Sequence, residues 1–259
     1  MRKKVKLPLN REGEVESLKY FSDQEKTAVI AMSYHTNTSQ NAYRYLAYRE
    51  ISGLVKKYAH GKRTLDYGAG TGISTQFLLN QGLLVDGVDV NTEMLDQAKV
   101  HCPEANFYKC KNGFIPVQSN AYDLIFSSFV FLEIPSEKEC VKYLSEGKRV
   151  LKSDGVFIAV TGSHEFYSRN WLSFKTDYPE NKNLKSGAKA KIVLIKSGME
   201  FTDFYWTEQD YCNFFEKSGL SLVEILYPLG KASEPFPWKD ETKYPPFAIL
   251  VAKHSLVVP

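Results

Sequence analysis

Three glycines at alternate positions, Gly68, Gly70 and Gly72, follow an apolar run that ends at Tyr67. A segment with helical character begins directly after them, at Ile73. Glycine lets the backbone adopt positive φ and lets a ligand approach the main chain closely. A strand, a turn of this kind and a helix N-terminus together predict a site for a nucleotide-like ligand.

A second apolar stretch ends in a carboxylate, Asp89, which lies 21 positions after Gly68. That spacing is close to the ~20 expected for an acid that binds ribose hydroxyls. The dinucleotide fingerprint requires glycine at its sixth position, which here is Ile73. Asp66, just before the turn, is poorly placed beside a pyrophosphate but suits a ligand's ammonium group. These features disfavour NAD and favour a nucleoside ligand that carries an ammonium group.

The pattern D-x-G-x-G-x-G, with an acid after the second strand, resembles class I S-adenosylmethionine-dependent methyltransferases, in particular the small-molecule, type-11-like group. The resemblance covers Thr64 to Thr161. Residues 122–126 look like the family's fourth strand, and residues 148–155 like its R-V-L-K-x-G-G turn. The chain departs from the family at Asp154, where glycine is usual, and at Lys111 or Asn112, where an acid often contacts the adenine amino group.

The resemblance implies a Rossmann-like, doubly wound α/β fold with a seven-stranded, mainly parallel sheet and an antiparallel last strand. It also implies S-adenosyl-L-methionine as cofactor and S-adenosyl-L-homocysteine as product. Asp89 would bind both ribose hydroxyls, Val90 and Met94 would flank the adenine, and main chain near Ser127 would reach the amino-acid end. The expected cofactor-binding residues are Asp66, Tyr67, Gly68, Ala69, Gly70, Gly72, Asp89, Val90, Met94, Asn112, Gly113, Ser127 and Ser128.

The acceptor is harder to predict, because methyl transfer is an in-line displacement that mainly requires alignment and exclusion of water. An N/D-P-P-Y/F motif after the fourth strand is missing, since residues 127–131 read S-S-F-V-F. A Pro-Cys nucleophile is also missing, and no acidic cluster suits a metal ion. We therefore predict O- or N-methylation of a small molecule without a metal. The alternatives are a tRNA- or rRNA-modifying enzyme, or a cofactor-binding module without methyl transfer.

The elements that must position these residues alternate between strand and helix. Apolar patterns predict strands at 64–67, 84–89, 106–109, 122–127, 156–161, 220–226 and 247–252, and helices at 73–81, 92–100 and 137–151. Asn91, Ser136 and Thr207 are the expected N-caps. An aromatic-rich stretch interrupts the alternation, with a hairpin around Ser197-Gly198. The expected units are a tail and helical cap (1–62), a cofactor-binding core (63–162), an inserted lid (163–206) and the rest of the core (207–259).

If the lid and the N-terminal segment close over the acceptor, Tyr34, His35, His164 and Tyr167 would face the reacting atoms. A histidine there could remove the acceptor's proton. His164 is preferred to His35 because it follows a strand, although a solvated loop residue is the simpler interpretation of both. Glu133 could also accept a proton or bind an ammonium group, although a solvent-facing acid at a helix start is more common.

The composition is that of an ordinary globular protein: 259 residues, 43% hydrophobic, with a net charge of +3. So small a charge does not favour nucleic acid as a partner. Four cysteines share no C-x-x-C spacing, and no long apolar run predicts a membrane segment. We expect a cytoplasmic protein that acts on a small-molecule acceptor as a monomer or homodimer.

Overall fold

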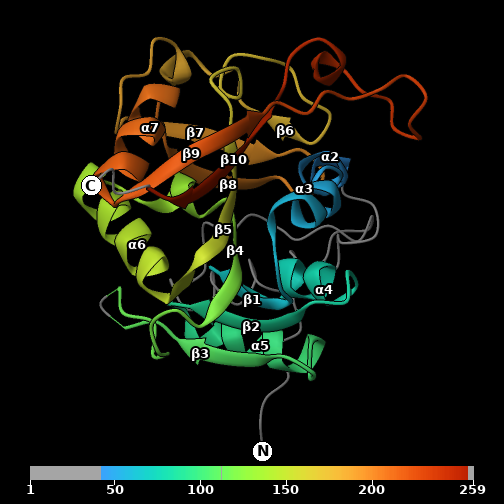
Figure 1. Ribbon diagram of the computed structural model, residues 1–259. Coiled ribbons are helices and arrows are strands. Elements are labelled where there is room, and N and C mark those ends of the chain that lie inside the picture. Colours follow the sequence, from blue (N-terminus) through green and yellow to red (C-terminus); the bar gives the residue numbers. More distant parts are fainter. Residues whose placement is uncertain (1–41, 112, 256–259) are drawn as a thin grey trace, which may run out of the picture.

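The computed structural model of the protein describes residues 42–111 and 113–255. At its centre is a seven-stranded sheet in the order β3-β2-β1-β4-β5-β10-β9 (Figure 1). All neighbouring strands are parallel except β10, which is antiparallel to both β5 and β9. This confirms the predicted doubly wound sheet. Its strands are β1 (Arg63–Tyr67), β2 (Leu84–Asp89), β3 (Asn106–Lys109), β4 (Tyr122–Ser128), β5 (Leu151–Gly162), β9 (Leu220–Leu226) and β10 (Phe247–His254).

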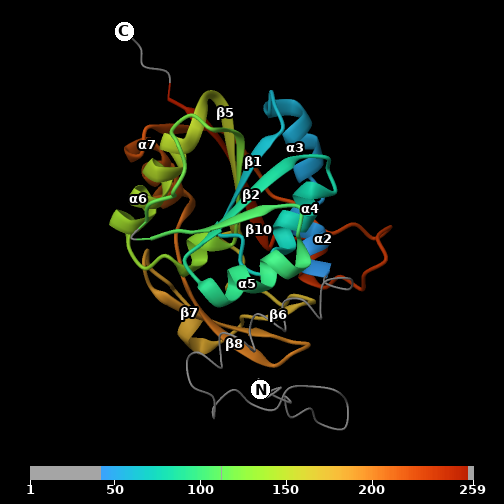
Figure 2. The same cartoon turned by 90° about the horizontal axis from the view of Figure 1, so that it is seen from below.

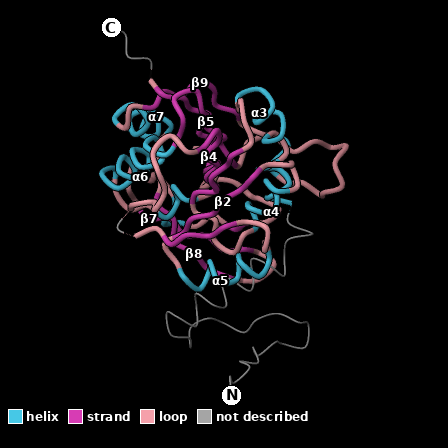
Figure 3. The backbone as a smooth tube through the Cα atoms, turned by 60° about the horizontal axis from the view of Figure 1, so that its bottom comes forward, coloured by secondary structure: helices cyan, strands magenta, loops and turns pink. Residues whose placement is uncertain are grey.

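Helices cover both faces of this sheet (Figures 1 and 3). On one face lie α2 (Ala42–Tyr48), α3 (Ile51–Tyr58) and α4 (Ile73–Leu79), and on the other lie α6 (Glu137–Val150) and α7 (Glu208–Lys217), as Figure 1 shows. The remaining helix, α5 (Thr92–His101), packs against β2 and β3. In α6 the buried residues recur at helical spacing, at Cys140, Leu144, Gly147 and Val150, so that one stripe faces the sheet.

The predicted N-caps are present at three helices. The Asn91 side chain accepts a hydrogen bond from the backbone N–H of Met94 at 3.1 Å, at the start of α5. Ser136 caps α6, and Thr207 forms a capping box with Asp210 at the start of α7. These bonds satisfy N–H groups that have no partner within the helix.

Strand β5 begins earlier than predicted, directly after α6. Its pairing with β4 jumps from Tyr122↔Leu151 to Leu124↔Val156, so the residues between Leu151 and Val156 form a bulge. Of the turn expected at 148–155, residues 148–150 instead end α6, and residues 151–155 belong to the bulged strand. An ion pair of 2.6 Å between the Lys152 Nζ and an Asp123 carboxylate oxygen joins this bulge to β4.

The stretch after β5 forms a separate three-stranded sheet in the order β6-β7-β8, a layer of its own in Figure 2. Its strands are β6 (Phe174–Lys175), β7 (Lys189–Leu194) and β8 (Met199–Phe204). The predicted hairpin joins β7 to β8, with Gly198 at φ +67°. Three short 3₁₀ turns complete the described elements: η3 (Val130–Glu133), η4 (Pro179–Asn181) and η5 (Asp240–Thr242).

The inserted sheet packs against the body through aromatic contacts and through η3. The rings of Phe174 and Tyr43 lie 4.9 Å apart edge to face, and the Trp171 side chain is fully buried. Strand β8 packs against η3, which directly follows β4. Within residues 42–111 and 113–255, none of the helices combines the length and the apolar character needed to cross a membrane.

Candidate active site

A cavity of about 750 Å³ opens where β1, β2 and β4 end. Its volume is in the range typical of small-molecule sites. The carboxyl ends of parallel strands, beside the point where strand order reverses, are where open α/β sheets bind ligands. The glycine turn, the end of β2, the end of β4 and faces of α2 and α6 contribute the lining. It consists of Tyr43, Arg44, Tyr48, Tyr67–Thr71, Ile73, Ser74, Val88–Asn91, Met94, Cys110, Gly113, Ser128–Val130, Glu133–Pro135, Glu139, Lys142 and Tyr143.

The glycine turn is held tightly against the neighbouring strands. Gly68, at φ +88°, and Ala69 donate their backbone N–H groups to the Val88 carbonyl at 2.8 and 2.9 Å. A Cβ atom at Gly68 would lie 2.2 Å from Val130 Cγ2, whereas a Cβ atom at Gly70 would meet nothing within 4 Å. Gly68 therefore permits close packing inside the protein, and Gly70 leaves open space beside the backbone.

Asp89 supports the turn and keeps acceptor capacity for a ligand. One carboxylate oxygen accepts the Gly70 N–H at 2.8 Å and the other accepts the Asn91 N–H at 2.8 Å. Burial raises the pKa of this carboxyl, and the backbone hydrogen bonds oppose that rise. A carboxylate offers about four lone-pair sites, so each oxygen retains an acceptor position. The arrangement fits a pair of ribose hydroxyls.

Asp66 lies behind the turn and not among the lining residues. One of its oxygens accepts hydrogen bonds from Ser74 Oγ at 2.7 Å and Thr75 Oγ1 at 2.6 Å, which join β1 to the start of α4. The other oxygen, Oδ1, is buried without a hydrogen-bond partner among the described residues. Burial raises the pKa of Asp66 to about 6. Its predicted contact with an ammonium group stays a prediction, for which only Oδ1 is available.

Most of the expected cofactor residues meet around the cavity. They are Tyr67, Gly68, Ala69, Gly70, Asp89, Val90, Met94, Gly113 and Ser128. Gly72 and Ser127 lie behind them: Gly72 precedes α4 and packs against Ala98 and Cys102, and Ser127 is fully buried. Asn112 lies outside the described residues.

Helix α2 contributes three side chains that sequence reasoning did not assign to the site: Tyr43, Arg44 and Tyr48. Arg44 is only 8% exposed, which is unusual for an arginine and places a cation in the cavity wall. The hydroxyl groups of Tyr48 and Ser128 share a hydrogen bond of 2.8 Å. In the sequence, the one sign of this role was that Arg44 interrupts an otherwise apolar stretch of the helix.

Comparison with known proteins agrees with this geometry. Residues 65–159 match the model of a methyltransferase domain, a span that includes the glycine turn, Asp89 and β4. Residues 65–159 thus form a methyltransferase domain.

Two curated relatives of the methyltransferase domain differ in how much they share with the chain. A demethylmenaquinone methyltransferase of Tropheryma whipplei is 30% identical over 106 residues, covering 40% of this chain but only 43% of that protein. A ubiquinone biosynthesis O-methyltransferase of Burkholderia orbicola is 26% identical over 191 residues, covering 69% of this chain and 75% of the relative.

Solved structures share the fold at lower identity. A putative S-adenosylmethionine-dependent methyltransferase from Listeria monocytogenes superposes with a TM-score of 0.59 at 21% identity, covering 81% of this chain and 96% of that one. One from Clostridium acetobutylicum has a TM-score of 0.59 at 16% identity, covering 90% of this chain and all of the other.

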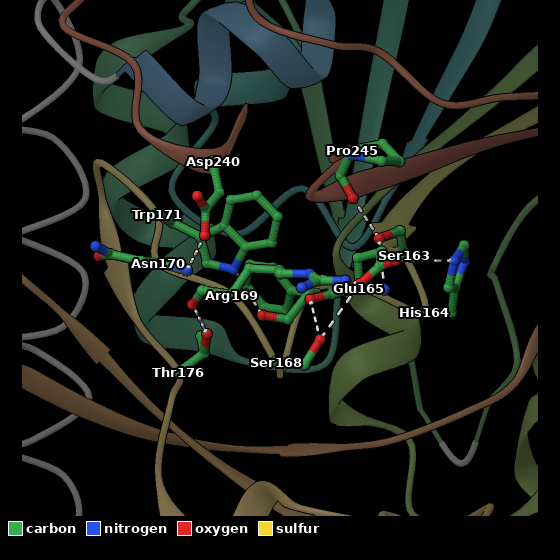
Figure 4. Close-up of polar contacts among 11 residues, drawn as sticks. Ser163, His164, Glu165, Ser168, Arg169, Asn170, Trp171, Thr176, Asp240 and Pro245 are labelled. Atoms are coloured by element: carbon green, nitrogen blue, oxygen red, sulfur yellow. Dashed lines mark hydrogen bonds and ion pairs between the residues drawn. The ribbon is translucent and has the colours of Figure 1, made fainter. Parts of the chain in front are cut away.

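The histidine expected to serve as a base in the methyltransferase domain does not line the cavity. The His164 side chain is 57% exposed, and its Nε2 atom lies 3.6 Å from a Glu165 carboxylate oxygen. Figure 4 shows it pairing with Glu165, on a turn whose Ser163 is anchored to Pro245 at the start of β10. The structure thus gives this expectation no geometric support.

Tyr167 is buried in the inserted sheet and donates a hydrogen bond to the Asp203 carboxylate at 3.0 Å. It does not line the cavity either, and Tyr34 and His35 lie outside the described residues. Within the part of the chain that the structure describes, none of residues 163–206 borders this cavity. The insertion instead packs behind the cavity wall, against η3 and against Tyr43.

The cavity wall also includes Phe129, a non-glycine residue at φ +64° that directly follows β4. Such a conformation is costly and is often found at functional sites. Glu133 follows on η3, where burial and the charge of Asp89 raise its pKa to about 7. In the described parts of the chain, no three histidine, cysteine or acidic side chains are grouped so as to hold a metal ion.

Proposed function

We propose that the protein transfers a methyl group from S-adenosylmethionine to an oxygen or nitrogen atom of a small-molecule acceptor. The observation that carries this proposal is one cavity that joins two kinds of wall. The first is the glycine turn with Asp89, and the second is the polar and aromatic end of β4. The cofactor supplies a methyl group that its sulfonium charge activates, so the protein has to orient the acceptor and exclude water.

The residues along the first wall fit the cofactor. Asp89 has free acceptor positions for the ribose hydroxyls, and Val90 and Met94 offer apolar surface to the adenine. Arg44 places a buried cation in the same cavity, which suits the cofactor's carboxylate. A buried guanidinium beside a carboxylate forms strong, charge-assisted hydrogen bonds.

A small acceptor is supported by the second wall and by the relatives. Phe129 of this wall, together with Tyr43 and Tyr48 of α2, offers the acceptor an aromatic surface, and the whole cavity has a volume of about 750 Å³. The curated relatives are named for the methylation of demethylmenaquinone and for ubiquinone biosynthesis. We therefore place the acceptor among small, partly apolar molecules.

Calorimetry tests the proposal without knowledge of the acceptor. S-adenosylmethionine and S-adenosylhomocysteine should bind the purified protein, and NADH should not. Binding of NADH alone would refute the proposal. A cell extract supplied with methyl-labelled cofactor should then yield a labelled small molecule, and label found in RNA instead would redirect the function to nucleic acid.

A further inference from the structure

Glu133 differs from the other acid on the acceptor side of the cavity. The Glu139 carboxylate accepts a hydrogen bond from Ser136 Oγ at 3.0 Å and belongs to the N-terminal cap of α6. Glu133 has no hydrogen-bond partner among the described residues, although it lines the same cavity. An acid in this position is available to a ligand.

The turn that carries Glu133 is held rigidly from two sides. The Phe131 side chain is fully buried, with its ring 5.6 Å from that of Tyr143 and 5.4 Å from that of Tyr211. On the other side, the Trp206 indole N–H donates to the Ile134 carbonyl at 3.3 Å. The insertion therefore fixes the backbone immediately after Glu133. A functional side chain on a supported backbone keeps its geometry.

Strand β8 also brings a buried acid to this turn. Asp203 is 6% exposed and accepts the Tyr167 hydroxyl, and β8 packs directly against η3. Burial raises the pKa of Asp203 to about 7, and the charge of Glu133 contributes to that rise. The charged or titratable groups that line the cavity with Glu133 are Arg44, Tyr43 and Tyr48 on α2, Tyr67 on β1, Asp89 on β2, Cys110 after β3, and Glu139, Lys142 and Tyr143 on α6. Asp203 on β8 also interacts with Glu133 electrostatically.

We propose that Glu133 is the catalytic acid–base residue of the acceptor subsite and that Trp206 of the insertion positions it. The inference rests on the proposed function. The acceptor's oxygen or nitrogen forms a bond to the methyl carbon while the carbon–sulfur bond breaks. The electron pair of the broken bond stays on sulfur. The proton that the acceptor loses goes to the Glu133 carboxylate.

The electrostatics of the site suit this role. The Glu133 side chain is exposed to the open cavity, while protein atoms surround its carboxyl group. Burial of the carboxyl group raises its pKa, and water at the open cavity limits that rise. A carboxyl group with a raised pKa is a better proton acceptor near neutral pH than an ordinary one.

Sinefungin tests this placement without a known acceptor, because it carries an amine where the cofactor carries its sulfonium and methyl group. Calorimetry at pH 6 and pH 8 measures the affinity of the protein for sinefungin and for S-adenosylhomocysteine. The ratio of the two affinities is the sinefungin preference. The preference for sinefungin should rise with pH, because Glu133 ionises while the amine stays protonated. At pH 8, Glu133→Gln should lower the sinefungin preference roughly 10- to 100-fold, as expected for the loss of one charge-assisted bond, and should abolish its pH dependence.

Glu200→Gln is the matched control, because Glu200 lies on β8, is 59% exposed and pairs with Lys191. It should behave as the wild type. An unchanged sinefungin preference in Glu133→Gln, with S-adenosylhomocysteine still bound, would overturn the inference and leave the proposed function intact. A wild-type protein that binds neither compound would refute the proposed function and this inference with it.

The positioning role of Trp206 has its own test. Trp206→Phe removes the N–H that reaches Ile134 and should reduce the sinefungin preference at pH 8 a few-fold without changing S-adenosylhomocysteine affinity. Trp238→Phe is the control, because its indole N–H donates to Glu234 in the loop before β10. A loss of stability with an unchanged sinefungin preference would show that Trp206 is structural only.

Discussion

The glycine turn and the inserted sheet make opposite contributions to the cavity. The turn lines it directly and is fixed by contacts within one strand–helix–strand unit, such as Gly70 with Asp89, 19 positions further along the chain. The insertion borders none of it among the described residues, yet holds the acceptor side through distant pairs such as Trp206 with Ile134. One strand–helix–strand unit therefore sets the proposed cofactor half of the site, and packing between more distant segments sets the proposed acceptor half.

The largest expected effect is on the cofactor half. Asp89→Ala removes the acceptor of the Gly70 N–H and the proposed partner of the ribose hydroxyls. We expect the binding free energy of S-adenosylhomocysteine to weaken by ~3–6 kcal/mol, since two charge-assisted hydrogen bonds are lost at ~1.5–3 kcal/mol each. Asp96→Ala, on the exposed face of α5, is the calorimetric control. Unchanged affinity in Asp89→Ala would remove the basis for assigning this half to the cofactor.

Alanine substitutions at two glycines of the turn should have different effects. Gly68→Ala places a methyl group 2.2 Å from Val130 Cγ2 at positive φ, and should cost ~2–4 kcal/mol of stability through overpacking and backbone strain. Gly70→Ala meets no atom within 4 Å, so it should cost only ~1–2 kcal/mol. Its methyl group should instead weaken cofactor binding. Denaturant unfolding and calorimetry on both variants separate the two effects, and equal losses of stability would contradict this difference.

The buried Asp203 of the insertion should make the free energy of unfolding depend on pH. Because burial raises the pKa of Asp203 to about 7, the folded state binds more protons than the unfolded state between an ordinary carboxyl pKa and that value. Stability should therefore fall as pH rises through this window, by at most about 4 kcal/mol.

Asp203→Asn keeps an oxygen for the Tyr167 hydroxyl and should flatten this dependence. Urea unfolding at pH 5 and pH 8 measures it in both proteins. If wild type and variant lose equal stability between these pH values, Asp203 does not cause the pH dependence of stability.

The smallest effect is expected at His164. Its side chain is exposed and its ion pair with Glu165 spans 3.6 Å, so His164→Ala should change stability by less than ~0.5 kcal/mol. Cofactor affinity should not change, and methyl transfer to an identified acceptor should slow less than twofold. A loss of ~10²–10⁴-fold in kcat would restore His164 as a base and would require the insertion to move.

The sequence was sufficient wherever function depends on neighbouring residues. Gly68, Gly70 and Asp89 could be read directly, because a turn between a strand and a helix, followed by the next parallel strand, is a local pattern. The alternation of strands and helices predicted the sheet for the same reason, and Asn91 and Thr207 marked helix starts. The bulge in β5 escaped prediction, because it depends on the pairing of Leu151 and Val156 with another strand.

Only the tertiary structure decided which further side chains line the cavity. His164 and Tyr167 had suitable chemistry and plausible positions, but the turn at Ser163 exposes the first, and the inserted sheet buries the second. Arg44 and Glu133 reach the cavity because α2 packs over the sheet and η3 is held between β8 and the aromatic core. Side-chain direction in these segments depends on contacts between residues far apart in the chain, and hydrophobic periodicity and short motifs do not encode them.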